Sequence, residues 1–234
     1  MKSLGIDIGS SSVKVSLLEI ETGECVASST NPQSEMRIDA PRPGWAEQDP
    51  ETWWYYACEG IRHISTDHNL REVVSIGITY QMHGLTLLDR AGKPLRKAII
   101  WCDSRAVEIG AEALEQIGRD FCLTHTLNSP GNFTASKLAW VKRNEPEIFD
   151  KIHRFMLPGD YIAYRLSGEI STSVSGLSEQ ILWDFKEEHR ADFVADHYGI
   201  PHDIIPEAGL SIGIQARTNK ATEEALGIPA GTPI

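Results

Sequence analysis

The sequence predicts an α/β domain in which a mixed β-sheet is flanked by helices and a helical insertion occupies much of the second half. Two observations carry this prediction. Three strand patterns follow one another at residues 3–8, 12–20 and 24–31, and a helical pattern and a fourth strand pattern come next. From Asn128 onward the pattern is mostly helical, and Pro and Gly interrupt it.

The first three strands are expected to form a meander. Residues 21–24, Glu-Thr-Gly-Glu, make a glycine-containing hairpin turn between the second and third strands. A Pro- and Gly-rich stretch at 41–45 then precedes a helix that runs from Pro50 to about His68. Asp49 is a good N-cap for this helix, and Pro50 suits its first turn.

Two further strands follow that helix. Residues 73–79 form a compact run rich in β-branched residues, which is typical of a buried strand. After a hairpin around residues 90–93, a strand at Ala98–Trp101 leads into Asp103-Ser104-Arg105 and a helix that ends at about Gly118. The order strand, strand, strand, helix, strand is that of half an actin-like or ribonuclease-H-like domain.

Composition narrows the classes of partner. The formal net charge of -11 over 234 residues argues against a nucleic acid or an anionic membrane, because those partners require clustered Lys and Arg. The strand pattern begins directly after Met1-Lys2 and no apolar run reaches about 18 residues, so neither a secretion signal nor a membrane span is expected. Four widely spaced cysteines without a C-x-x-C pair predict reduced thiols in a cytoplasmic protein: Cys25, Cys58, Cys102 and Cys122.

The opening strand, turn and strand have the pattern of a phosphate-binding hairpin. Gly9, Ser10 and Ser11 make a turn that lets phosphate oxygens approach the main chain. Asp7 would act through Mg²⁺ or water, since like charges repel, and Lys14 adds a positive charge if it points the same way. The alternative is an ordinary hairpin whose turn happens to contain Asp and Ser.

Polar side chains also follow the predicted strand at 73–79, at the end that faces the crevice in open α/β sheets. Gln81 and His83 could exchange hydrogen bonds with vicinal hydroxyls of a sugar, and Met82 could fill irregular space beside it. The alternative is that His83 has a purely structural role.

A third candidate set follows the next strand. Trp101, Asp103 and Arg105 combine an aromatic face, a carboxylate and a guanidinium, which could bind a sugar's C–H face and its hydroxyls. The alternative for Asp103 is that it caps the helix that follows.

These three segments resemble the amino-terminal half of the FGGY carbohydrate kinases, most closely the xylulokinases. Residues 7–14 match the family's Asp-x-Gly-(Ser/Thr)-(Ser/Thr)-x-x-(Lys/Arg) pattern, and residues 81–84 match the xylulokinase-like Gln-Met-His-Gly. The resemblance covers nearly the whole chain and extends to residues 45–54, 136–140, 157–162 and 166–169.

The resemblance implies ATP-dependent phosphorylation of D-xylulose in a parent protein with two actin-like domains, of which this chain supplies the sugar-binding one. Asp7 would order Mg²⁺ and the γ-phosphate of ATP, and Met82 and His83 would contact the sugar. The carboxy-terminal domain of the same kinase would hold ATP and supply the general base. The isolated chain is therefore expected to be a weak sugar binder and a very poor kinase.

Two rival functions stay open at this stage. One is a kinase of the same family that acts on L-ribulose, L-fuculose, L-rhamnulose or a polyol such as glycerol, because pocket shape alone distinguishes these substrates. The other is a non-catalytic sugar-binding module of actin-like fold. A homodimer is a further alternative for the assembly.

Overall fold

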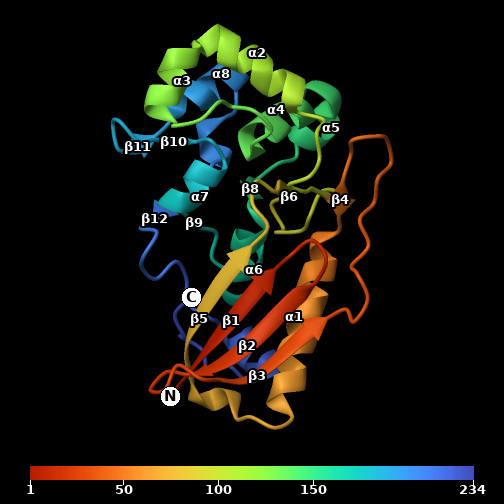
Figure 1. Cartoon of the computed structure of the whole chain (residues 1–234), viewed down its shortest axis with the longest axis vertical. Helices are drawn as coiled ribbons and strands as arrows, with labels where there is room; N and C mark the ends of the chain where they lie inside the picture. The colour runs from red at the N-terminus through yellow and green to blue at the C-terminus, as the bar shows by residue number, and fades with distance from the viewer.

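Four strands form the central sheet, in the order β3-β2-β1-β5. In the computed structural model, which describes residues 1–234, β1 (Lys2–Ile8), β2 (Val13–Glu19) and β3 (Cys25–Asn31) make an antiparallel meander. β5 (Val73–Tyr80) pairs in parallel with β1 (Figure 1). The predicted mixed sheet, its meander and the order of these elements along the chain are confirmed.

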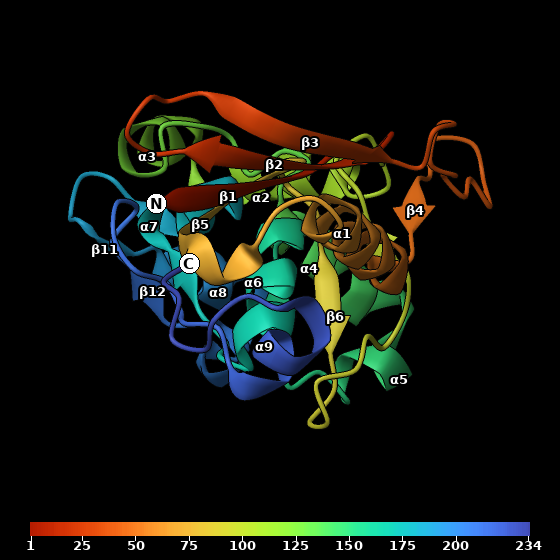
Figure 2. The same cartoon turned by 90° about the horizontal axis from the view of Figure 1, so that it is seen from below.

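Alternating side chains give the sheet one apolar and one polar face. Residues of β1 and β2 that point to the first face are fully buried: Leu4, Ile6, Ile8, Val13, Val15 and Leu17. This face packs against α1 (Pro50–Ser65), α6 (Pro158–Ser167) and α9 (Lys220–Leu226), which all lie on the same side of the sheet (Figure 2). Asp7 and Lys14 lie on the opposite, polar face.

A helical cap, defined here as residues 107–153 and 174–205, lies beyond the carboxyl ends of β1 and β5 (Figure 1). It has its own buried core, to which Leu138 and Val141 contribute. Its helices are α2 (Val107–Ile117), α3 (Arg119–His125), α4 (Thr134–Asn144), α5 (Pro146–Phe149), α7 (Val174–Glu179) and α8 (Asp192–Tyr198), with a 3-10 turn at His202–Ile204.

Short strand pairs join the sheet to the cap. β4 (Glu47–Gln48) pairs with β7 (Ala98–Ile99), and β6 (Thr86–Leu88) pairs with β8 (Arg154–Met156). The remaining short elements are η1 (Leu70–Glu72), β9 (Thr172–Ser173), β10 (Trp183–Asp184), β11 (His189–Arg190) and β12 (Ala208–Gly209). No helix is long and apolar enough to cross a membrane.

Two predicted boundaries are corrected. α1 ends at Ser65 rather than near His68, and the Thr66 hydroxyl donates to the His63 carbonyl at the helix end. The strand predicted to reach Trp101 ends at Ile99. The following helix begins at Val107, after two turns closed by the bonds from the Asp103 N–H to the Ile100 carbonyl and from the Val107 N–H to the Ser104 carbonyl.

Close contact between α6 and β5 fixes the end of β5, from which residues 81–83 continue. A Cβ atom added to Gly159 would lie 1.9 Å from Cδ1 of Tyr80. We predict that Gly159→Ala lowers the free energy of unfolding by about 1–3 kcal/mol, because the side chains must shift to relieve this overlap. Urea unfolding measures the change.

Gly77→Ala is the matched control. A Cβ atom added to Gly77, on the polar face of β5, would meet nothing within 4 Å. Its effect is expected to stay within about 0.5 kcal/mol of wild type. Equal effects of the two substitutions would contradict the assigned packing of α6 against β5.

Candidate active site

The turn between β1 and β2 has the tight geometry that its sequence predicts. The Gly9 N–H donates to the Ser12 carbonyl over 3.0 Å. A Cβ atom at Gly9 would lie 2.9 Å from that carbonyl oxygen, so the close turn requires glycine. The Met36 N–H donates to the Ser11 carbonyl over 2.7 Å and holds the turn from outside.

Asp7 and Lys14 lie opposite one another on β1 and β2, on the same face of the sheet. They line a shallow hollow of about 500 Å³, in which Asp7 is the only acidic residue. The half-buried Asp7 carboxylate has no hydrogen-bond or ion-pair partner within the chain. It is therefore free to bind a cation or a water molecule.

The donor set around Asp7 restricts how a metal ion could be held. The structure contains no group of three or more His, Cys, Asp or Glu side chains that could hold one. Mg²⁺ is commonly bound by one or two carboxylates together with waters and phosphate oxygens. Asp7 fits that kind of site, in which water or a bound phosphate group would supply the remaining ligands.

Gln48 connects the turn to β5 and α1. Its side chain is only 2% exposed, and its Nε2 donates to the Ser10 carbonyl over 2.7 Å. Its Oε1 accepts from Nε1 of Trp53 at 3.0 Å and from Nε2 of Gln81 at 3.2 Å. A second bond from Nε2, to the Arg37 carbonyl, uses the remaining donor, so every hydrogen-bonding position of this amide is satisfied.

Residues 81–83 continue directly from the end of β5. The Gln81 N–H donates to the Ile8 carbonyl over 2.8 Å, which extends the pairing of β5 with β1 by one residue. Met82 is 52% exposed. Oε1 of Gln81 is buried and has no hydrogen-bond partner, so it can accept a bond from a ligand hydroxyl or a water.

His83 is held in an unusual backbone conformation with φ of 56°. Its Nδ1 lies 2.9 Å from the Glu179 carbonyl oxygen and 3.3 Å from that residue's Oε2. Because these oxygens only accept, we assign the proton of a neutral imidazole to Nδ1, which leaves Nε2 as an acceptor. The ring of Phe133 packs edge-on against His83 at a centroid distance of 4.3 Å.

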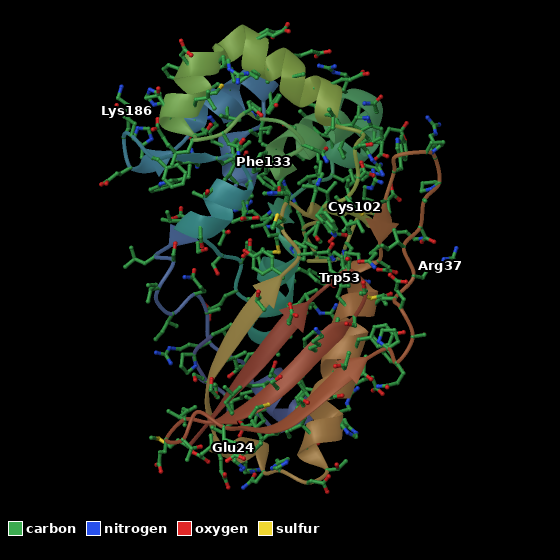
Figure 3. The ribbon with its side chains drawn as sticks, viewed as in Figure 1. Glu24, Arg37, Trp53, Cys102, Phe133 and Lys186 are labelled. Atoms are coloured by element: carbon green, nitrogen blue, oxygen red, sulfur yellow. The ribbon has the colours of Figure 1, made fainter.

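Trp101, one of the three residues predicted at and after the end of the strand at 98–101, lies beside the turn that follows β1. Its Nε1 donates to the Ser10 hydroxyl over 3.3 Å, and 49% of the residue is exposed. Figure 3 shows the neighbouring Cys102, with Phe133 and Trp53, around the junction between the sheet and the helical cap. The turn after β1, residues 81–83 and Trp101 thus meet at the carboxyl ends of β1 and β5.

Asp103 and Arg105 follow Trp101 but are buried and bound to each other, and their contact with a sugar stays a prediction. The Asp103 side chain is 0% exposed and the Arg105 side chain is 1% exposed. Both Asp103 oxygens accept from Arg105, and Oδ2 also accepts from the Ala46 N–H over 2.6 Å. Asp103 does not cap the next helix, since that helix has Ala106 as its N-cap. This pair braces the loop that carries Trp101.

Arg105 is also enclosed by aromatic rings. Its guanidinium carbon lies 3.8 Å from the ring centroid of Trp45 and 4.9 Å from that of Trp140. It forms a second ion pair with Glu47 over 2.7 Å. The loop after Trp101 is thereby tied to β4 by charge and by stacking.

Comparison with known proteins decides the family. Residues 3–234 match the model of the N-terminal domain of the FGGY family of carbohydrate kinases. This chain belongs to the FGGY family. Its relatives include a xylulose kinase of Escherichia coli, 37% identical over 203 residues, and one of Klebsiella pneumoniae, 36% identical over 226 residues.

This FGGY domain aligns with only part of the length of each of those relatives. The alignments cover 87% and 97% of the chain but only 41% and 46% of the two relatives. The crystal structure of a xylulose kinase from Rhodospirillum rubrum matches with a TM-score of 0.91 at 26% identity, over 100% of this chain and 48% of that one. The predicted actin-like fold is confirmed, and the chain spans less than half the length of these proteins.

Sequence reasoning missed three residues that shape the site of this FGGY domain. Gln48 and Lys137 lie within segments that carry the family resemblance, but neither residue type signals a role there. Glu179 ends α7, about a hundred residues after the histidine it contacts. Only the folded chain brings each of them to residues 81–84.

Replacing the Gln48 amide tests whether it holds the site together. We predict that Gln48→Met destabilises the domain by at least about 2 kcal/mol, because it leaves the buried Trp53 N–H without an acceptor and frees the Gln81 side chain. Chemical denaturation followed by tryptophan fluorescence measures the loss. Gln33→Met removes one exposed bond to the Thr30 carbonyl and should leave stability within about 0.5 kcal/mol. A Gln48→Met protein as stable as this control would contradict the assigned network.

Proposed function

We propose that this chain is the sugar-binding half of an ATP-dependent ketopentose kinase that converts D-xylulose to D-xylulose 5-phosphate. The observation that carries the proposal is the gathering of the exposed Met82 and Trp101 beside the turn after β1, in a chain whose relatives are named xylulose kinases. A phosphoryl-transfer site requires the acceptor and the phosphate to be held side by side.

Three side chains suit a small polyhydroxylated substrate. Nε2 of His83 accepts a hydrogen bond from a sugar hydroxyl, because the Glu179 carbonyl occupies the Nδ1 side of the ring. The indole face of Trp101 packs on sugar C–H groups, and the thioether of Met82 fills the remaining space. Oε1 of Gln81 offers a further acceptor from the buried side.

The turn after β1 supplies the phosphate side of the proposed site. The backbone of Gly9, Ser10 and Ser11 approaches the transferring phosphoryl group, and Lys14 adds positive charge. Asp7 would hold Mg²⁺, which when bound with ATP neutralises charge on the transferring group. Asp7 orders that site and does not itself attack.

The proposed division of labour places the remaining machinery outside residues 1–234. The carboxy-terminal domain of the parent protein would bind most of ATP and supply the general base that accepts the sugar hydroxyl proton. Closure of two domains over the sugar would exclude water and prevent wasteful hydrolysis of ATP. This division is supported by the two alignments, which cover less than half the length of each relative.

We propose that the protein is cytoplasmic, which the four free cysteines support.

Two alternative functions differ from this proposal. A kinase of this family that acts on another sugar or polyol would use the same turn with a different pocket. A non-catalytic sugar-binding module is less favoured, because binding a sugar alone requires neither the free Asp7 carboxylate nor the tight turn at Gly9.

ADP release tests the activity. We predict that a chain extended past Ile234 through the second domain releases ADP with D-xylulose, and that residues 1–234 alone turn over at least about 1000-fold more slowly, because base and nucleotide site are missing. L-Ribulose, L-fuculose, L-rhamnulose and glycerol serve as comparison substrates. A preference for one of them would show that D-xylulose is not the substrate. Sugar binding without ADP release by the extended chain would favour the non-catalytic binding module.

Substitution separates the phosphate and sugar roles. In the extended chain, Asp7→Asn is expected to lower kcat by about 100-fold or more with little change in sugar KM, because it removes a charge needed mainly for phosphoryl transfer. His83→Ala is expected to raise the KM for D-xylulose by about tenfold or more and to change the KM for ATP little.

Matched controls are Asp203→Asn and His63→Ala, whose side chains are exposed and remote from the site. Both should leave kcat and KM within about twofold of wild type. If the His83 variant raised the two KM values equally, the assignment of His83 to the sugar would be wrong.

A further inference from the structure

Lys137 is a buried cation without an ion-pair partner. It lies in the first turns of α4, and its side chain is 0% exposed. Removal of an ammonium from water is expensive, and burial lowers the pKa of Lys137 to about 8, against the opposing effect of the nearby Asp103. An apolar residue would fill the same space more cheaply, so the lysine calls for a reason beyond packing.

Its ammonium binds two backbone carbonyls that belong to different parts of the site. Nζ donates to the His83 carbonyl over 2.7 Å and to the Ile100 carbonyl over 3.1 Å. The first carbonyl follows directly on Met82, and the second precedes Trp101. One charged group therefore fixes the backbone at both of the segments that carry exposed side chains into the site.

The contacts around Lys137 show that this part of α4 acts as a platform for residues 81–84. The Thr134 hydroxyl donates to the Gly84 carbonyl over 3.3 Å, and the Phe133 ring packs against His83. His83 holds a left-handed backbone conformation that a non-glycine residue adopts only when its surroundings impose it. A charge-assisted bond to its carbonyl is the strongest such restraint in reach.

We propose that Lys137 is a positioning residue for sugar binding, which acts by holding the His83 and Ile100 carbonyls on one ammonium and so setting the separation of His83 from Trp101. This rests on the proposed sugar kinase function. Lys137 touches no substrate in this arrangement. Its effect reaches the sugar through residues 82, 83 and 101.

The same helix provides a matched control. Lys142 also donates its ammonium to two backbone carbonyls, those of Tyr198 and Gly199, but these lie in the cap away from the site. Lys142→Met removes the same kind of interaction as Lys137→Met. Any difference in sugar kinetics between the two variants reports the position of the lysine rather than the loss of an ammonium bound to two carbonyls.

The kinetic test uses the extended chain with D-xylulose and ATP. Lys137→Met is expected to raise the sugar KM by about tenfold or more and to leave the ATP KM within about twofold, because small displacements of binding groups cost large factors. Lys142→Met should leave both KM values within about twofold. A folded Lys137→Met protein with unchanged sugar KM, or with both KM values raised equally, would overturn the proposal.

Hydrogen exchange of residues 1–234 gives a readout that needs no activity. Lys137→Met is expected to speed amide exchange in residues 81–84 and 100–103 by about tenfold or more, with no change in β1 and β2. Unchanged exchange in both segments would overturn the proposal. If the wild-type extended chain proves inactive on every sugar, the proposed function fails, and exchange alone then decides whether Lys137 fixes the two segments.

A variant that keeps the charge provides the test if Lys137→Met does not fold. Lys137→Arg retains donors but displaces them relative to the two carbonyls. If Lys137→Met lacks a folded near-ultraviolet circular dichroism spectrum, Lys137→Arg decides instead. A raised sugar KM at unchanged ATP KM then supports the proposal, and an unchanged sugar KM contradicts it.

Discussion

Parallel pairing of β1 with β5 is the constraint on which the site depends. The two strands share one direction, so their carboxyl ends fall side by side, and the bond from the Gln81 N–H to the Ile8 carbonyl continues the pairing past both strand ends. The turn at residues 9–12 and the segment at 81–83 therefore begin from one fixed edge. The proposed phosphate and sugar sites can cooperate only if such an edge sets their spacing, since phosphoryl transfer tolerates little error in the placement of its reactants.

Buried polar groups then brace the loops that leave this edge. Gln48 satisfies its whole amide between the turn, the Arg37 carbonyl, Trp53 and Gln81. The Asp103–Arg105 pair ties the Trp101 loop to β4. Each of these groups stabilises only while all its partners are present, because an unpaired buried polar group costs about 1–3 kcal/mol. Lys137 is a further buried group of this kind, and it carries a full charge. The exposed residues Met82 and Trp101 are thus supported from beneath by buried side chains.

The local sequence pattern was enough to predict the sheet. It could not predict contacts between residues that lie far apart in the sequence. Alternation of apolar residues gave the three-stranded meander and put Asp7 and Lys14 on one face. It could not distinguish Trp101 from Asp103, which lie two residues apart, because the burial of Asp103 is set by Ala46, 57 residues earlier in the chain. Gln48, Lys137 and Glu179 escaped notice for the same reason. Their roles come from partners distant in the sequence, and a polar residue inside a helix or short strand gives no local sign of such partners.

The most direct test of the account is a crystal structure of the extended chain with D-xylulose bound. We predict that the sugar lies between Met82, His83 and the face of Trp101, with a hydroxyl within about 3.2 Å of Nε2 of His83 and with Lys137 still bound to both carbonyls. A sugar bound elsewhere, or one that reaches the hollow beside Asp7 without touching His83 or Trp101, would contradict it.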